Sequence, residues 1–276
     1  MDSKLIKRLD FFTEFQDWYL QIKEDFKFDL KKDSEARDYL SLILLKKNRN
    51  WNLNSVINSF KDRILAKNKI LIYGCGPSLE ETINIIIKKK GVNFFENFIN
   101  LAADGASILL REKKIKIDAV FTDLDGITKK EFKYSNFIIV HAHGDNIDNL
   151  KFFEDEILSF QNLIGTTQVK PVTNIINPGG FTDGDRILYF LRSLLISSQK
   201  LFLIGMDFGS IVGKYSKLDI KINQSASTTK QKKLIYARKL IKWLSQKIEN
   251  EIFYVNSKDV IDGFINLSLK EFFNTL

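Results

Sequence analysis

Five short apolar runs of this chain each end abruptly in glycine, aspartate or histidine. In order they read KILIYGCGPSL (69–79), FINLAADGA (98–106), DAVFTDLDG (118–126), FIIVHAHGDN (137–146) and LFLIGMDFG (201–209). Segments with helical periodicity follow most of them, and strands that alternate with helices form a parallel sheet covered by helices. We therefore predict an α/β fold with a Rossmann-like, mostly parallel sheet. Because ligands bind beyond the carboxyl ends of such strands, the five endings are expected to build one polar cleft.

The rest of the chain divides around this pattern. Apolar residues at three- or four-residue spacing from Leu5 to Ile22, after Asp33 and from Val56 to Ile64 predict helices without strands. We predict an N-terminal helical region (1–66), a Rossmann-like core (67–216) and a C-terminal helix–strand–helix segment (217–276) that completes the domain. Strands are expected at 69–73, 98–103, 118–122, 136–142, 201–205 and 252–255, and core helices at 79–90, 105–113, 147–158, 184–197 and 229–248.

Composition excludes several classes of protein. The chain of 276 residues has one cysteine and two histidines, too few for a disulfide or for a zinc hydrolase. Its net charge of +8 comes from lysines scattered in short clusters, typical of a solvated surface, without a nucleic-acid-binding motif. The N-terminus is unlike a signal peptide, and charges interrupt every long apolar stretch. We expect a cytoplasmic protein that binds neither nucleic acid nor membrane.

The most informative ending is TDLDG. If the strand persists through it, Asp123 and Asp125 project to one side, where two carboxylates repel unless a cation such as Mg²⁺ lies between them. A turn closed by Gly126 is the alternative. The letters also resemble the first motif of haloacid-dehalogenase-type phosphatases, and GDNID (144–148) resembles the last. Only about twenty residues separate the two, which leaves no room for the intervening elements of that family.

The first ending, GCGPSLEE, is neither a complete dinucleotide fingerprint nor a P-loop. Gly74 and Gly76 allow a tight turn with close approach of a ligand. Ser78 and Glu81 have the spacing of a capping box, and the helix start offers amide groups to a phosphate. An ordinary strand-to-helix turn is the alternative.

The remaining motifs have weaker individual signals. Asp104 is placed to cap a helix. His141 and His143 are expected to orient or protonate a ligand, and a buried histidine with its hydrogen bonds satisfied is the alternative for one of them. In PGGFTDGDRI, a cap with first-turn carboxylates explains the aspartates, while Arg186 is able to hold a phosphate. Lys214 lies in a candidate phosphate-contacting loop. The basic helix KKLIYARKLIKWLSQKI (232–248) reads as a packed helix with a lysine-rich outer face rather than a membrane-binding helix.

Taken in order, the motifs of residues 69–216 resemble those of archaeal 6-hydroxymethyl-7,8-dihydropterin diphosphokinases, which look related to thiamine diphosphokinases. The resemblance implies Mg²⁺-dependent transfer of diphosphate from ATP to the hydroxymethyl group of the pterin, releasing AMP. It implies catalytic roles for Asp123, Asp125, His143 and Asp145, and metal binding by Asp123, Asp125 and Asp185. The implied ATP-binding residues are Gly74, Gly76, Pro77, Ser78, Asp104, Thr182, Asp183, Arg186 and Lys214.

Several alternatives remain open at this point. Gly126, in place of the serine of the thiamine enzymes, and the HAHGDN segment favour the pterin over thiamine as acceptor. A nucleotide-sugar glycosyltransferase with a similar GxGPSL turn and a nucleotide-binding regulator without turnover are the other classes. Asp104, Asn146 and Asn177 are all eligible to read the pterin ring. The N-terminal helices are able to cover the site or to form a homodimer.

Overall fold

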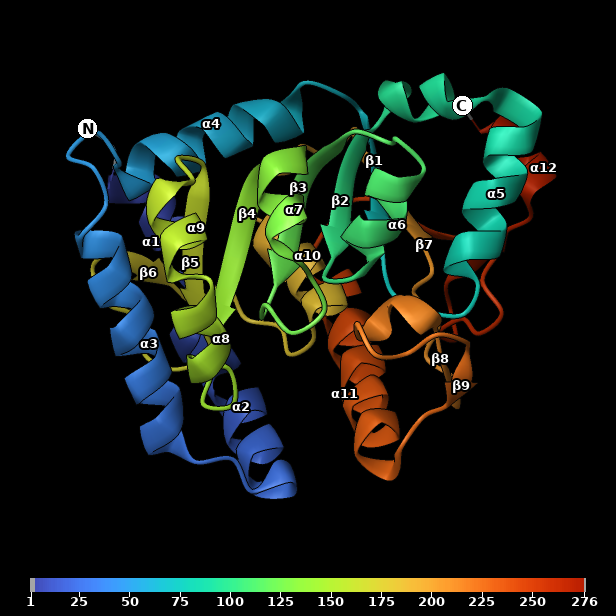
Figure 1. Cartoon of the computed structure of the whole chain (residues 1–276). Helices are drawn as coiled ribbons and strands as arrows, with labels where there is room; N and C mark the ends of the chain where they lie inside the picture. Colours follow the sequence, from blue (N-terminus) through green and yellow to red (C-terminus); the bar gives the residue numbers. More distant parts are fainter. Residues whose placement is uncertain (1–2, 276) are drawn as a thin grey trace.

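A nine-stranded parallel sheet runs through the middle of the molecule, between two layers of helices (Figure 1). A computed structural model describes residues 3–275; Met1, Asp2 and Leu276, at the ends of the first and last predicted segments, lie outside the described residues. The strands are β1 (Lys69–Tyr73), β2 (Ile99–Ala103), β3 (Ile117–Thr122), β4 (Ser135–Ala142), β5 (Leu163–Thr167), β6 (Ile175–Ile176), β7 (Lys200–Ile204), β10 (Ile252–Val255) and β11 (Ile265–Leu267). A separate antiparallel pair joins β8 (Ile211–Val212) to β9 (Gln224–Ser225).

The strand order β11-β10-β7-β1-β2-β3-β4-β5-β6 contains one reversal of direction. From β1 the chain proceeds outward to β6, and then returns to place β7 on the other side of β1. The register pairs Tyr73 with Ile204, so β1 and β7 end at the same level. Such a switch point opens a crevice at the carboxyl ends of the two strands, where α/β proteins bind ligands.

Alternate side chains of each strand face different helical layers. Ile70 and Ile72 pack with α1 (Ser3–Arg8), α2 (Phe12–Phe26), α4 (Leu53–Leu65), α10 (Asp183–Leu191) and α11 (Thr228–Ser245). Leu71 and Tyr73 pack on the other face, against α3 (Leu30–Leu45), α5 (Leu79–Lys90), the 3₁₀ helix η1 (Val92–Asn97), α6 (Ala106–Glu112), α7 (Lys129–Tyr134), α8 (Ile147–Phe152), α9 (Glu154–Ser159) and α12 (Leu269–Asn274). A short 3₁₀ turn, η2 (Lys214–Ser216), follows β8. Burial on both faces explains why the strands read as continuous apolar runs.

The predicted α/β fold with a parallel sheet and an N-terminal helical region is confirmed. Each of the six predicted strands is present, and β5, β6, β8, β9 and β11 were missed. The helix expected over 184–197 ends at Leu191, and the two residues that follow it contact the N-terminal segment. The guanidinium of Arg192 stacks on Phe11 with its carbon 3.2 Å from the ring centroid, and Ser193 donates a hydrogen bond to the carbonyl of Arg8. The three-part division of the chain stays a prediction.

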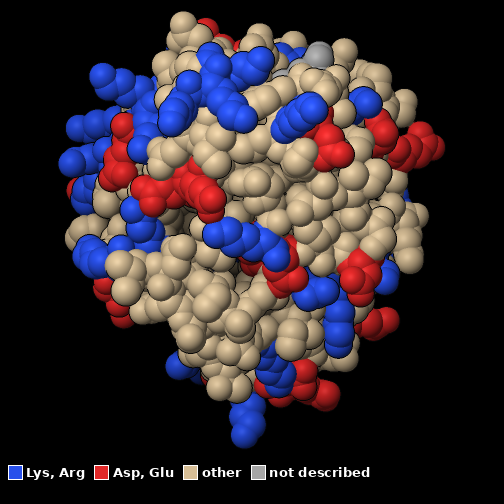
Figure 2. All heavy atoms as spheres, turned by 90° about the vertical axis from the view of Figure 1, so that its right-hand side faces the viewer, with Lys and Arg blue, Asp and Glu red and all other residues tan. Residues whose placement is uncertain are grey.

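The surface carries charges of both signs. Figure 2 shows basic and acidic side chains interspersed with uncharged areas on the face at the right of Figure 1. Such mixing is typical of a solvated surface. None of the helices within residues 3–275 combines the length and apolar character needed to cross a membrane.

Candidate active site

A cavity of about 540 Å³ lies at the carboxyl ends of the central strands. Its walls include residues that follow β1, β2, β3, β4 and β7, so the five polar endings surround one space. Two further walls come from outside the sheet: the turn between α2 and α3, and the first turns of α11. In Figure 1, α2 and α11 lie below the ends of β3 and β4.

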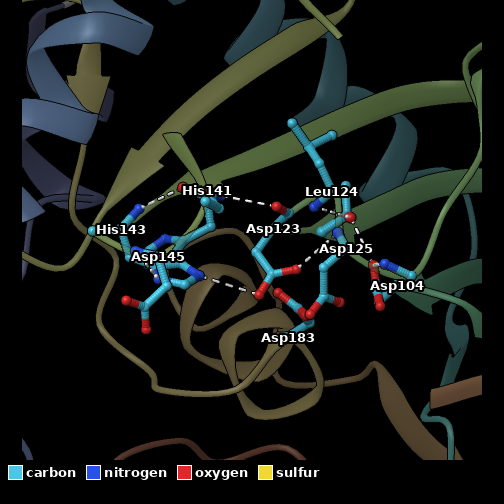
Figure 3. Close-up of polar contacts among 12 residues, drawn as sticks. Asp104, Asp123, Leu124, Asp125, His141, His143, Asp145 and Asp183 are labelled. Carbon is cyan, nitrogen blue, oxygen red and sulfur yellow. Dashed lines mark hydrogen bonds and ion pairs between the residues drawn. The ribbon is translucent and has the colours of Figure 1, made fainter. Parts of the chain in front are cut away.

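Four carboxylates gather at the centre of this cavity. Asp104, Asp123 and Asp125 each offer an oxygen, and these oxygens lie within 4.8 Å of one another. Figure 3 shows that Asp183, at the start of α10, points toward the same cluster. Carboxylate oxygens at this spacing form a donor set that suits a hard cation such as Mg²⁺.

The local structure around Asp104 requires a neighbouring glycine. Asp104 has a left-handed backbone (φ 43°), which aspartate tolerates better than most residues. Its carboxylate accepts hydrogen bonds from the Thr122 hydroxyl (2.7 Å) and the Gly126 amide (3.3 Å). A Cβ atom at Gly126 would lie 1.8 Å from Asp104 Oδ2. Gly126 therefore makes room for the carboxylate.

The cluster holds more negative charge than its burial favours. Burial, together with the charges of neighbouring aspartates, raises the pKa of Asp104 and of Asp183 well above the ordinary value. Burial and the charge of Asp123 also raise the pKa of Asp125. Burial acts in the same direction on Asp123, but the hydrogen bond from His143 holds its pKa below the usual range. A bound cation would relieve this repulsion, so the four carboxylates fit a metal.

His143 is held in one orientation beside Asp123. Its Nε2 lies 3.2 Å from Asp123 Oδ2, and its Nδ1 accepts a hydrogen bond from the Asp145 amide (3.3 Å). Because Nδ1 is an acceptor, Nε2 carries the hydrogen and donates it to Asp123. Both ring nitrogens are therefore engaged, and His143 orients Asp123.

The side chain of Asn146 fixes the same loop. It donates to the carbonyls of Asp123 (2.8 Å) and His141 (2.7 Å) and accepts from the His143 amide (3.0 Å). Asn177, also eligible on sequence to read the acceptor ring, is buried and bonded to Val169 and Gly179. The side-chain amides of Asn146 and Asn177 therefore form hydrogen bonds within the protein rather than facing an acceptor ring.

Two further polar residues of this region, His141 at the end of β4 and Asp145 in the loop after it, differ in exposure. His141 is buried, with Nδ1 3.1 Å from Thr166 Oγ1, and burial lowers its pKa well below the ordinary value. Asp145 lies exposed at the rim of the cavity, and in Figure 3 its carboxylate points away from Asp123. Only Asp145 of this pair lines the cavity.

The glycine turn after β1 does not offer the expected amide cradle. The amides of Gly74 and Gly76 donate to the carbonyls of Ile204 (2.9 Å) and Gly205 (2.7 Å). A Cβ at Gly76 would lie 2.5 Å from Asp207 Oδ2. These glycines line the cavity, but their small size serves the contact between the turns after β1 and β7.

The expected capping box of Ser78 and Glu81 is wrong. The amide and hydroxyl of Ser78 both donate to Asp207 Oδ2, at 2.8 and 2.7 Å. Glu81 instead forms an ion pair with Lys258 (2.9 Å). The sequence spacing was right for a capping box, but a carboxylate 129 residues away in the sequence competes for the serine.

At the start of α10, the structure separates the two aspartates. Asp185 is fully buried, and its Oδ1 accepts hydrogen bonds from the amides of Phe181 (2.9 Å) and Thr182 (2.8 Å). Burial raises its pKa to about 6. The structure therefore does not bring Asp185 to the acidic cluster; Asp183 occupies that place. Thr182 lines the cavity beside it.

Two basic residues predicted to contact phosphate have different surroundings. Arg186 lines the cavity, where its guanidinium donates to Asp183 (3.3 Å) and to the Phe181 carbonyl (2.9 Å). Lys214 pairs with Glu80 (2.8 Å) and, like Pro77, is not among the cavity-lining residues. Lys217 lies closer to the cluster, 3.6 Å from Asp125.

The N-terminal helices supply a wall that sequence reasoning left unassigned. Asp33 accepts hydrogen bonds from the Tyr19 hydroxyl and from the Gly144 amide (2.6 Å), and so ties α2 and α3 to the loop after β4. Phe26 and Phe28 stack with ring centroids 5.3 Å apart and pack against Phe181. The turn between α2 and α3 thereby presents aromatic rings to the cavity.

Two lysines near the start of α11 also reach the cavity, although Lys239 and Lys242 of the same helix are exposed, in agreement with the expected lysine-rich outer face. Lys230 and Lys233 are half-buried and line the wall opposite the strand ends. The only sequence signal was the density of lysine in this helix, which does not tell an inner from an outer face.

Comparison with known proteins gives one consistent family. The profile of the 6-hydroxymethylpterin diphosphokinase MptE-like family matches residues 41–213. The 6-hydroxymethyl-7,8-dihydropterin pyrophosphokinase of Methanocaldococcus jannaschii is 37% identical over 248 residues, 86% of this chain and 97% of the relative. That of Pyrococcus furiosus is 35% identical over 233 residues, 84% of this chain and 93% of the relative. A solved structure, the MAf glycosyltransferase from Magnetospirillum magneticum AMB-1, aligns over 81% of this chain and 39% of its own, with 14% identity and a TM-score of 0.43.

Proposed function

The chain belongs to the 6-hydroxymethylpterin diphosphokinase MptE-like family, and from this premise we propose that it transfers diphosphate from ATP to 6-hydroxymethyl-7,8-dihydropterin. The acceptor hydroxyl oxygen attacks the β-phosphorus, the bond between that phosphorus and the α–β bridging oxygen breaks, and AMP leaves. The acidic cluster inside one cavity is the observation that supports this assignment, because phosphoryl transfer depends mainly on positioning and charge neutralisation.

We assign the metal-binding role to Asp104, Asp123 and Asp125, with Asp183 beside them. This set replaces Asp185 by Asp104 and Asp183, because the Asp185 carboxylate caps α10. Mg²⁺ bound there would neutralise charge on the phosphate oxygens. Burial and then the repulsion between the carboxylates raise the pKa values of Asp104 and Asp183, and both effects support a bound cation at this place.

The surrounding residues have positioning roles in this proposal. His143 holds the Asp123 carboxylate through Nε2, and Arg186 holds Asp183 while it presents positive charge to the cavity. Asp145 is the better candidate for a general base, because it lines the cavity while both ring nitrogens of His143 are engaged. If the transition state is loose, the acceptor hydroxyl needs little activation, and Asp145 has only to accept its proton.

The acceptor is proposed to be the pterin rather than thiamine. The names of the relatives support the pterin. The thiamine enzymes have a serine where this chain has Gly126, and the Asp104 carboxylate occupies the space that a side chain at position 126 would need. We expect the reaction to take place in the cytoplasm, for which the single cysteine is the supporting observation.

The test is AMP release from ATP and Mg²⁺ with 6-hydroxymethyl-7,8-dihydropterin, with thiamine, and without acceptor. We expect AMP and a diphosphorylated pterin in equal amounts, and no AMP with the other two mixtures. Asp123→Asn should lower kcat by roughly 10²–10³-fold, since it removes charge at the metal. Asp148→Asn, at an exposed position with a side chain 95% accessible, is the matched control and should leave kcat unchanged. AMP with thiamine alone would correct the acceptor, and no AMP with either would refute the diphosphokinase assignment.

A further inference from the structure

Lys230 and Lys233 lie one turn apart near the beginning of α11, and both line the cavity. Residues three apart share one face of a helix. The first turn is fixed by Ser227, whose hydroxyl accepts a hydrogen bond from the Lys230 amide (3.2 Å). The two lysines thus reach the cavity from a rigid element.

Neither lysine has an acidic partner within the part of the chain that the structure describes. No carboxylate oxygen lies within 4.0 Å of either ammonium group, whereas neighbouring Lys232 pairs with Asp25 and Lys217 pairs with Asp125. Lys233 Nζ instead lies 5.9 Å from the centroid of the Phe181 ring. Burial, and then the charge of Lys230, lower the pKa of Lys233. Half-buried ammonium groups without a partner are unfavourable unless a ligand supplies one.

The acidic cluster faces these lysines across the cavity. Asp123, Asp125 and Asp183 line the same cavity as Lys230 and Lys233, at more than ion-pair distance from both ammonium groups. These groups therefore interact electrostatically at separations longer than an ion pair. A ligand that fills the space must offer anionic oxygens to the lysines and a cation to the carboxylates.

A metal-bound polyphosphate has both properties. We propose that Lys230 and Lys233 form the binding site for the β- and γ-phosphate groups of Mg·ATP, opposite the carboxylates that hold the metal. The proposal rests on the proposed function for the identity of the nucleotide. It also explains how a helix outside the family-matched residues 41–213 contributes to the site.

The test is binding of Mg²⁺ with α,β-methylene-ATP, which cannot be cleaved at the α–β position, compared with binding of AMP. Lys230→Gln and Lys233→Gln are each expected to weaken binding of the analogue by about tenfold, the loss of one charge-assisted hydrogen bond. Affinity for AMP should change less than about twofold, because AMP lacks the β- and γ-phosphates. Lys242→Gln, exposed on the same helix, is the matched control and should change neither affinity.

An equal loss of affinity for AMP and for the analogue, or no loss for either, would overturn the proposal. The lysines are half-buried and unpaired, so both variants should fold, as circular dichroism and Tm will report; either variant alone is sufficient for the test. Because this assay contains no acceptor, its outcome is independent of the AMP-release assay. A selective loss of affinity for the analogue, without pterin-dependent AMP release, would support the polyphosphate site and refute the pterin kinase. Pterin-dependent AMP release without a selective loss would support the pterin kinase and refute the polyphosphate site.

Discussion

At the scale of single residues, Gly126 and Asp104 depend on each other. The Asp104 carboxylate occupies the space that a side chain at position 126 would need, and it accepts the Gly126 amide. Any side chain at position 126 must therefore displace a proposed metal ligand. A glycine that looked like part of an acidic turn is required by the geometry of the cluster.

We predict that Gly126→Ala weakens Mg²⁺ binding by about 10–100-fold, the range for residues that orient metal ligands. Isothermal titration calorimetry measures this affinity. Asp104→Asn, which keeps the left-handed backbone and both hydrogen bonds, should weaken Mg²⁺ binding while raising Tm of the metal-free protein by about 2–4 °C, because it removes a repelling charge. If Gly126→Ala acts through Asp104, the double variant should bind Mg²⁺ no more weakly than Asp104→Asn alone. Fully additive losses would show that the two positions act separately.

At the scale of secondary-structure elements, Asp207 joins three strand-end segments. It accepts hydrogen bonds from the amide and hydroxyl of Ser78 after β1, and from Ser257 and Lys258 after β10. It lies itself after β7, and it is 6% exposed. One carboxylate therefore holds together the turns that flank the switch point.

We predict that Asp207→Ala lowers the free energy of unfolding by about 2–4 kcal/mol, because buried donors on two neighbouring segments lose their acceptor. Urea unfolding monitored by circular dichroism measures the change. Asp148→Ala, on an exposed helix surface with a side chain 95% accessible, should change it by less than about 0.5 kcal/mol. A small effect at Asp207 would mean that water replaces the carboxylate at little cost.

At the scale of the whole molecule, the acidic cluster links the free energy of unfolding, and the proposed metal binding, to pH. Burial and neighbouring charges raise the folded-state pKa values of Asp104 and Asp183 above the unfolded value. At pH values between the unfolded-state pKa and the raised folded-state pKa of these aspartates, the folded protein holds more protons than the unfolded chain. The free energy of unfolding of the metal-free protein therefore falls as pH rises through this window.

Mg²⁺ needs the ionised carboxylates and should reverse this trend. We predict that saturating Mg²⁺ raises Tm more at about pH 8 than at about pH 5.5, because protons compete with the metal at the lower pH; at 100 times Kd the stabilisation is about 2.7 kcal/mol. Thermal unfolding with Mg²⁺ or with a chelator at the two pH values measures the difference. Asp104→Asn should reduce the rise in Tm caused by Mg²⁺ at both pH values. The same increment at both pH values would contradict a metal site built on these carboxylates.

The order of strands and helices, and the strand ends that carry Gly74, Asp104, Asp123 and His143, were predictable from the sequence. Apolar runs buried on both faces and the periodicity of the helices depend on residues close in the chain. Strand β5 was missed, because Gly165 and two threonines interrupt its apolar pattern.

Only the tertiary structure decided which polar groups share the cavity. Asp183 joins the acidic cluster while Asp185 caps its own helix, and Ser78 bonds Asp207 rather than Glu81. The lysine-rich helix places Lys230 and Lys233 inward. Sequence pattern reports the periodicity of an element but not its rotation against distant segments. Those contacts join residues far apart in the chain, and packing and hydrogen-bond competition in the folded molecule determine them.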